Sequence, residues 1–279
     1  MAAASQDAAA APFVAPFVDF QDVWLAYNEE LLRANHFAVE AIDLKVKRGE
    51  FIAIVGPSGC GKSTFMKLTT GLKMPSMGKI RIDGQPVTGP LKISGMAFQA
   101  PSLLPWRTTV DNVLLPLEIV EPYRSSFKSK RKEYEERARR LLQKVGLGGY
   151  EDKFPWQLSG GMQQRVSIAR ALSFDPELLL MDEPFGALDE IVRDHLNEQL
   201  LQLWAKTRKT VLFVTHSIPE AVFLSTRIVV MSPRPGRITD VIDCNFPRDR
   251  TLEIRETPEF MAIAQRVRTG LRAGHSYDE

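Results

Sequence analysis

A glycine-rich loop between a strand-like run and a helix-like segment constrains the fold of this chain most strongly. Residues 51–55 are continuously apolar, which is typical of a parallel strand buried on both faces. The loop GPSGCGKS follows at residues 56–63, with the spacing GxxxxGK and then Ser or Thr. An ordinary strand-to-helix turn is the alternative, but this spacing arises by chance only about 0.01 times in a chain of average composition. The sequence therefore predicts a site for nucleotide phosphates.

The residue types in this loop suit phosphate chemistry. Glycines let backbone N–H groups converge on phosphate oxygens at a helix N-terminus. Lys62 can place a positive charge on the β- and γ-phosphates, and the Ser63 hydroxyl can ligate Mg²⁺. The expected phosphate-binding residues are Gly56, Pro57, Ser58, Gly59, Cys60, Gly61, Lys62, Ser63 and Thr64. This loop alone does not distinguish kinases, GTPases and ATPases.

A second apolar run, at residues 178–181, ends in two acidic residues. We expect it to be a strand that delivers Asp182 to the carboxyl end of the sheet, where its carboxylate can hold Mg²⁺. Glu183 comes one residue later and can polarise an attacking water. The alternative is that these are two solvated acids at the end of a strand. The presence of the glycine loop in the same chain argues strongly against this alternative.

A second glycine-containing segment, LSGGMQQR, precedes a helix predicted over residues 163–172. Ser159, Gly160 and Gly161 would form another group of backbone donors suited to an anion. A simple helix N-cap is the alternative, because a short Ser-Gly run commonly serves that purpose.

The order of these three segments resembles that of the ATP-binding-cassette (ABC) ATPases, over residues 18 to about 243. The resemblance implies ATP and Mg²⁺ as cofactors, with Ser63, Gln99 and Asp182 at the metal ion. It also implies that two chains sandwich two ATP molecules. Each ATP would lie between the glycine loop of one chain and the LSGG segment of the other.

The resemblance assigns further residues that spacing alone leaves without a role. Tyr27 corresponds to the aromatic residue that stacks on adenine, although a half-buried strand aromatic is the alternative. Gln99 would touch Mg²⁺ and the attacking water, and His216 would contact the γ-phosphate, so that Glu183, Gln99 and His216 form the catalytic set. Asp189 closes the segment GALD, which is implied to contact the partner across the dimer.

Strands that alternate with helices of about 10–17 residues predict an α/β fold with a parallel sheet. The resemblance implies a P-loop NTPase (RecA-like) core with a small antiparallel β subdomain. The run KIRIDGQPV predicts an edge hairpin with Asp83 and Gly84 at its turn. We expect a disordered tail at 1–16, the ABC ATPase domain at 17–245 and a short C-terminal helical extension at 246–279. An α-helical subdomain is predicted as an insertion at about 100–162.

Composition excludes several other classes of protein. The 279 residues are 44% hydrophobic and 25% charged, as in an ordinary globular chain. The net charge of +2 gives no reason to expect nucleic acid, and the charged stretch at 124–140 is better explained as a solvated helix face. No apolar run approaches the roughly 18 residues that cross a bilayer. We therefore expect a soluble chain without a disulfide, which meets a membrane through a partner.

Exporters generally fuse the cassette to membrane helices, and cassette proteins of DNA repair or translation carry a coiled-coil insertion or a second cassette. Neither pattern fits, so we expect the separate ATPase subunit of a bacterial importer, peripheral on the cytoplasmic face of the inner membrane. Its expected partners are a second copy of the chain, permease subunits and a periplasmic solute-binding protein. A soluble ABC ATPase in a process other than transport is the alternative.

Several segments resemble the nitrate/sulfonate/taurine import subfamily, namely LLPW, DEPFGALD, HSIPEAVFL and MSPRPGR. Importers of thiamine-precursor pyrimidines belong to the same group and stay an alternative. The solute itself cannot be read from this chain. The apolar side chains of Leu103, Leu104 and Trp106 are expected to dock a membrane subunit, with packing inside the helical subdomain as the alternative.

Overall fold

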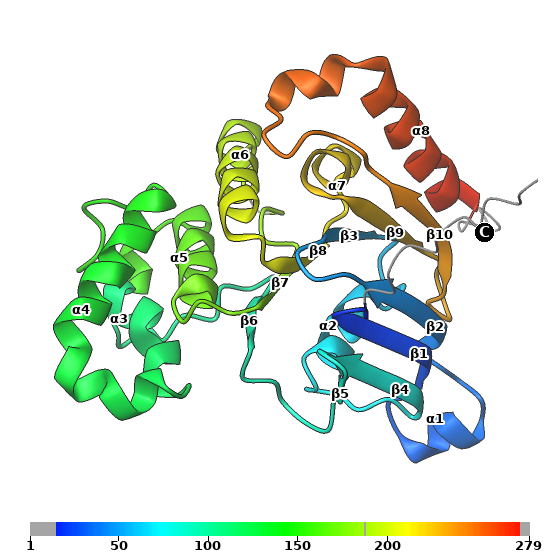
Figure 1. Ribbon diagram of the computed structural model, residues 1–279, viewed down its shortest axis with the longest axis horizontal. Coiled ribbons are helices and arrows are strands. Elements are labelled where there is room, and N and C mark those ends of the chain that lie inside the picture. Colours follow the sequence, from blue (N-terminus) through cyan, green and yellow to red (C-terminus); the bar gives the residue numbers. More distant parts are fainter. Residues whose placement is uncertain (1–14, 187, 274–279) are drawn as a thin grey trace, which may run out of the picture.

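A six-stranded sheet runs through the centre of the molecule in the computed structural model, which describes residues 15–186 and 188–273 (Figure 1). The strand order is β10-β9-β3-β8-β7-β6, and all neighbours are parallel except β10 with β9. The strands are β3 (Phe51–Val55), β6 (Ser94–Ala97), β7 (Leu178–Asp182), β8 (Thr210–Val214), β9 (Arg227–Met231) and β10 (Ile238–Asp243). The predicted α/β fold with a parallel sheet is confirmed. Residues 1–14 of the tail predicted at 1–16 lie outside the described residues.

The two faces of the sheet are covered by different layers, as Figure 1 shows. Residues Phe51, Ala53 and Val55 of β3 join a hydrophobic cluster with α6, α7 and α8. Ile52 and Ile54 point the other way, into a cluster with α2 and the second sheet. The helices concerned are α2 (Lys62–Thr69), α6 (Glu190–Thr207), α7 (Ile218–Leu224) and α8 (Pro258–Ala273). A sheet buried on both faces explains the continuously apolar strands in the sequence.

A smaller antiparallel sheet packs below the central one, in the order β2-β1-β4-β5. Its strands are β1 (Val18–Leu25), β2 (Val39–Val46), β4 (Met77–Ile82) and β5 (Gln85–Pro86). Asp83 and Gly84 both have positive φ, so the predicted hairpin turn is confirmed. The loop between β1 and β2 contains the short helix α1 (Glu29–Arg33), which Asn28 caps.

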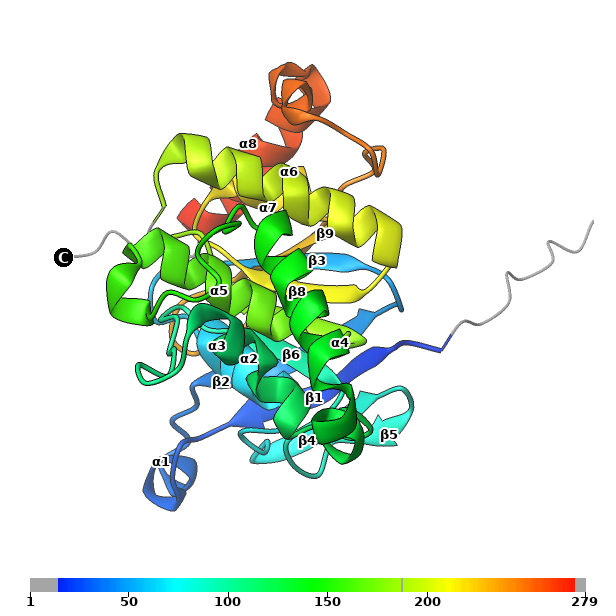
Figure 2. The same ribbon diagram turned by 90° about the vertical axis from the view of Figure 1, so that its left-hand side faces the viewer.

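Helices α3 to α5 form a separate lobe beside the sheet, which we call the helical lobe (Figures 1 and 2). It contains α3 (Thr109–Leu114), a 3₁₀ helix (Leu115–Glu118), α4 (Tyr123–Lys144), a second 3₁₀ helix (Pro155–Gln157) and α5 (Gly160–Leu172). The lobe has its own hydrophobic cluster, to which α5 contributes Val166 and Ala169. Ile168 and Ala171 on the other face of α5 belong to the main core. Helix α5 therefore packs against both the lobe and the main core.

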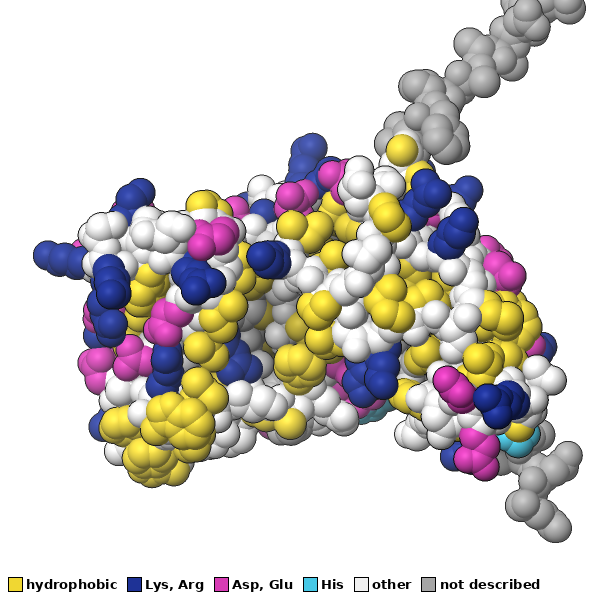
Figure 3. Space-filling model, turned by 90° about the horizontal axis from the view of Figure 1, so that it is seen from below, with side chains coloured by type: hydrophobic (Ala, Val, Ile, Leu, Met, Phe, Trp, Pro, Cys, Tyr) yellow, Lys and Arg dark blue, Asp and Glu magenta, His cyan; other side chains and the backbone are white. Residues whose placement is uncertain are grey.

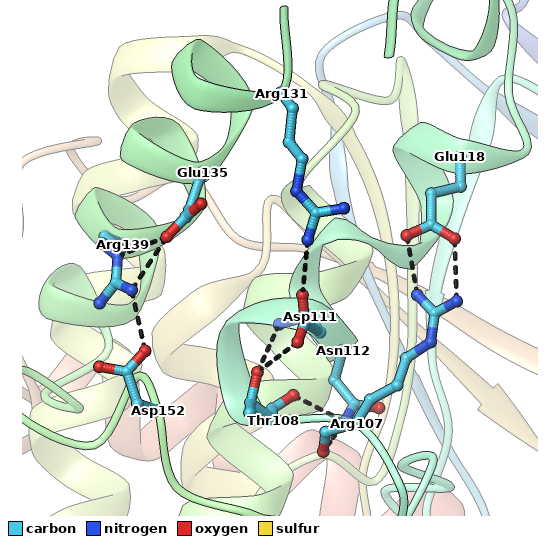
Figure 4. Close-up of polar contacts among 9 residues, drawn as sticks. All are labelled: Arg107, Thr108, Asp111, Asn112, Glu118, Arg131, Glu135, Arg139 and Asp152. Atoms are coloured by element: carbon cyan, nitrogen blue, oxygen red, sulfur yellow. Dashed lines mark hydrogen bonds and ion pairs between the residues drawn. The ribbon is translucent and has the colours of Figure 1, made fainter. Parts of the chain in front are cut away.

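Helix α4 begins at Tyr123 and carries the charged stretch. Its exposed face is tied to the rest of the lobe by ion pairs (Figure 4). Arg139 pairs with Glu135 at 3.0 Å and with Asp152 at 2.8 Å, and Arg131 contacts Asp111 at 3.4 Å. These contacts agree with the interpretation of this stretch as a solvated helix face.

The last helix, α8, packs with one face on the main core. Phe260, Ala264 and Val267 are buried, and Ile263 and Leu271 are partly buried, which is the spacing of one helix face. Within the described ranges no helix combines the length and the apolar character that crossing a bilayer requires.

Candidate functional site

The glycine loop leads from β3 into α2 and has the backbone shape that an anion-binding nest requires. Gly59 and Gly61 have φ of 77° and 94°, values that favour glycine. A Cβ on Gly61 would also lie only 2.6 Å from Cγ1 of Val39. The Lys62 ammonium is buried and donates to the carbonyl oxygens of Gly56 and Pro57, at 2.8 and 3.0 Å. These two bonds hold the ammonium in the curve of the loop.

An open cavity of about 440 Å³ lies over this loop. It is lined by Tyr27, Phe37, Ala38, Ser58, Gly59, Gly61, Lys62, Ser63, Thr64, Gln99, Glu183 and Arg234. The sequence had singled out most of these residues, but not Phe37, Ala38 or Arg234. Gly56, Pro57 and Cys60 were expected at the phosphates, but they form the loop without lining the cavity. Burial raises the pKa of the Cys60 thiol, so Cys60 acts as a small packed side chain.

Asp182 ends β7 next to the start of α2, where its carboxylate lies beside Ser63. Burial raises the pKa of the Asp182 carboxyl, while a hydrogen bond with Ser63 and the charge of Lys62 oppose that shift. A divalent cation would favour the ionised carboxylate further. Oxygen donors are the ligands that Mg²⁺ prefers, so the hydroxyl and carboxylate present here fit this ion.

Glu183 follows Asp182 and makes polar contacts with both other expected catalytic side chains. Its Oε2 accepts a hydrogen bond from Nε2 of Gln99 at 3.2 Å and lies 3.5 Å from Nδ1 of His216. Glu183 has a positive φ of 47°, a conformation that side chains rarely adopt. Its N–H nevertheless bonds to the carbonyl of Val214 at 2.9 Å, so β8 helps to hold this turn. The structure thus brings Gln99, Glu183 and His216 together.

A buried polar network below His216 was missed by the sequence reasoning. The Thr215 hydroxyl donates to Glu220 at 2.5 Å and accepts from the N–H of Ser217 at 2.9 Å, which fixes the backbone on both sides of His216. Burial raises the pKa of the Glu220 carboxyl, and the Thr215 hydrogen bond and the Arg193 charge oppose this. Arg193 lies 3.7 Å from Glu220 and donates to the carbonyl of Leu188. The part of the network that no local pattern indicates is Arg193, because α6 brings it beside Glu220 of α7 only in the folded chain.

Tyr27 lies beyond the end of β1 and is 48% exposed, so it lines the cavity instead of packing within the sheet. Its hydroxyl is 2.6 Å from Oγ1 of Thr64 in the first turn of α2. The Lys73 ammonium lies 5.8 Å from the ring centroid. The ring is therefore held at the edge of the phosphate loop, as an aromatic platform for a base would need to be.

The remaining expected residues form a second group, away from the cavity. Ser159 is the N-cap of α5, and its hydroxyl accepts a hydrogen bond from the N–H of Met162 at 3.3 Å. The capping role considered as the alternative is therefore present in the structure. A Cβ on Gly161 would lie 2.6 Å from Leu188, whereas Gly160 has open space around it. Asp189 caps α6 through Val192. The helix start and the loop before α6 therefore pack together and present one exposed surface.

Comparisons with known proteins agree on one family. Residues 39–186 match the family model described as ABC transporter. The chain is 50% identical to an uncharacterized ABC transporter ATP-binding protein of Methanocaldococcus jannaschii, over 77% of this chain and 78% of that protein. It is 43% identical to the taurine import ATP-binding protein TauB of Yersinia pestis, over 82% and 89%.

Solved structures give the same result for the fold. A dimeric ATP-binding cassette in a post-hydrolysis state, bound to ADP and Pi, is 31% identical with a TM-score of 0.69, over 82% of this chain and 100% of that one. A cbiO1 structure from Clostridium perfringens is 24% identical with a TM-score of 0.70, over 92% and 98%, and supports the fold alone.

Proposed function

The chain belongs to the ABC transporter family of ATPases, and from this premise we propose that it is the ATP-hydrolysing subunit of a bacterial importer for a small solute. The name of its taurine-importing relative supports an importer and a solute of the nitrate, sulfonate or taurine type. The choice of solute rests with other subunits, so a thiamine-precursor pyrimidine is compatible with the same cassette. The exposed segment that follows Gln99 carries the proposal, because it offers a surface for a permease directly beside the cavity.

The residues of the cavity have distinct proposed roles in hydrolysis. The glycine loop and Lys62 bind the phosphates, and Tyr27 supports the adenine. Ser63 and Gln99 in the cavity, with Asp182 beside Ser63, would hold Mg²⁺, which would neutralise charge on the phosphates. Glu183 accepts a proton from the attacking water, and its contacts orient Gln99 and His216 toward the γ-phosphate.

Dimerisation is part of the proposal, because the expected ATP contacts lie in two separate places on one chain. The cavity contains the phosphate loop, whereas Ser159 and Gly160 lie exposed at the start of α5. A second copy facing the first can place its Ser159 over the cavity. The dimeric solved relative supports this arrangement. The loop around Asp189 would then contact the partner beside the same ATP.

The turn that carries Trp106, between Gln99 and α3, is held by one buried side chain, that of Asn112. The Oδ1 of Asn112 accepts from the N–H of Leu104 at 2.8 Å. Its Nδ2 donates to the carbonyl oxygens of Leu104, Arg107 and Thr108 at 3.0–3.1 Å. Arg107 also forms a two-pronged ion pair with Glu118 (Figure 4). These contacts tie the turn to α3 and to the 3₁₀ helix that follows it.

Trp106 projects from this segment and is 71% exposed, so the alternative in which Trp106 packs inside the helical subdomain is wrong. Leu103 does pack partly against the lobe cluster. Figure 3 shows hydrophobic side chains gathered on the helical lobe, at the lower left of that view. An exposed tryptophan on a hydrogen-bonded turn is a suitable anchor for a short permease helix. Buried aromatic anchors at interfaces often contribute about 2 kcal/mol or more to binding.

Replacing Trp106 by alanine should weaken assembly with the permease and leave the isolated chain nearly unchanged. The side chain is exposed, so its loss should alter neither folding nor basal ATPase activity. Co-purification of the cassette with its permease in detergent measures assembly, and solute-stimulated ATPase activity measures coupling. Met261→Ala is the matched control, since Met261 is an exposed apolar residue on the distant helix α8. Normal assembly of the Trp106 variant with the permease would show that the docking surface lies elsewhere. A wild-type chain that binds no permease would contradict the proposed importer function.

A further inference from the structure

Arg234 lines the same cavity as Lys62, although it lies on the turn between β9 and β10, far from the glycine loop in sequence. A Cβ placed on Gly59 would lie 3.8 Å from Nη2 and 3.9 Å from Nε of Arg234. The guanidinium group therefore faces the crest of the phosphate loop. The sequence MSPRPGR around it had indicated a subfamily but no role for the arginine.

The turn that carries Arg234 is fixed against the loop by its backbone. The N–H of Gly236 donates to the carbonyl of Ala38 at 3.1 Å, and the N–H of Glu40 donates back to Gly236 at 2.9 Å. A Cβ on Gly236 would lie only 2.0 Å from the carbonyl oxygen of Cys60, so this position requires glycine. The base of the arginine is thus anchored to both the glycine loop and β2.

The Arg234 guanidinium has no ion pair or hydrogen bond within residues 15–186 and 188–273. Its neighbour Arg237 differs in this respect, because it pairs with Glu40 at 2.7 Å. The acid that lines the cavity, Glu183, is engaged with Gln99 and His216. The cavity consequently holds two cations, Lys62 and Arg234, beside a loop of N–H donors.

We propose that Arg234 is a phosphate-binding residue, whose guanidinium donates to oxygens of the terminal phosphates of a nucleoside di- or triphosphate in this cavity. The proposal rests on the proposed nucleotide function and adds a residue to it. The planar guanidinium fork matches two phosphate oxygens at once, which an ammonium cannot do. Its position over Gly59 places it at the phosphates and not at the base, which Tyr27 would support.

The test compares the dissociation constants of ATP, ADP and AMP for the wild-type chain and for Arg234→Ala, by calorimetry at protein concentrations that keep the chain monomeric. We expect Arg234→Ala to lose roughly tenfold or more in affinity for ATP and ADP and to keep its affinity for AMP. Arg234→Lys should recover only part of the loss, since lysine keeps the charge without the fork. Arg237→Ala removes an arginine of the same turn that is already paired, and it should bind ATP like the wild type.

The possible outcomes separate this inference from the proposed function. Failure of the wild-type chain to bind ATP would refute the nucleotide site itself. Normal ATP binding by Arg234→Ala, with thermal melting like that of the wild type, would overturn the role of Arg234 alone. A variant that binds ATP normally but no longer dimerises would also overturn it, because the guanidinium would then contact the second chain. The inference is supported only if Arg234→Ala weakens the binding of ADP and leaves the binding of AMP unchanged.

Discussion

Changing Glu183 to glutamine should reduce the rate of ATP hydrolysis by roughly 10²–10⁴-fold while leaving ATP binding intact. Glutamine keeps the size of the side chain and can still contact Gln99 and His216, but it cannot take a proton from water. The nucleotide should therefore remain bound and unhydrolysed, and the dimer that closes around it should persist. Phosphate release and size-exclusion chromatography with ATP and Mg²⁺ measure the two effects.

Glu30→Gln provides the control for this experiment, because Glu30 is an exposed acid on α1 and should be dispensable for hydrolysis. Turnover of the Glu183 variant within a few-fold of the wild type would show that another group accepts the proton. Loss of ATP binding in the same variant would instead assign Glu183 to binding the nucleotide or its metal ion.

Replacing Ser159 by arginine should abolish the ATP-dependent dimer without affecting ATP binding to the monomer. Ser159 and Gly160 are exposed at the start of α5, and Gly160 has open space around it for a ligand or a partner. A large side chain there would occupy the space that the partner's ATP requires, whereas the cavity of the same chain would be untouched. Size-exclusion chromatography in the Glu183→Gln background measures the dimer directly.

Ser159→Ala is the matched control, since Ser159 also caps α5 through the N–H of Met162. Loss of that cap costs about 1 kcal/mol of stability but adds no bulk, so the alanine variant should still dimerise. A dimer that survives the arginine substitution would leave the LSGG segment with the capping role alone.

The features that sequence predicted best are those in which a local pattern carries the chemistry. The glycine loop, Lys62 and Asp182 follow strands whose apolar runs are unmistakable, and the geometry of the loop depends on residues within it. The Asp83 turn is a similar case, because two adjacent residues determine its shape. Such features need little information from distant parts of the chain.

Other parts of the site depend on tertiary contacts and could not be predicted. Arg234 reaches the cavity only because Gly236 packs against Cys60, across a long separation in sequence. Glu220 lies near Arg193 only because α6 and α7 pack together in the folded chain. The short edge strand β6 has no distinctive pattern, since its four residues include Ser94 and Gly95. The exposure of Trp106 likewise could not be read from its neighbours, because the nearby residue Leu103 packs partly against the lobe.

The most direct test of the account is the ATPase activity per chain, measured with Mg²⁺ over a wide range of protein concentrations. If the cavity of one chain is completed by Ser159 of a second, activity per chain should rise with concentration and level off when dimers dominate. Lys62→Ala should remain inactive throughout, because it lacks the ammonium expected at the phosphates. Activity per chain that is the same at every concentration would show that one chain suffices and would contradict the shared site.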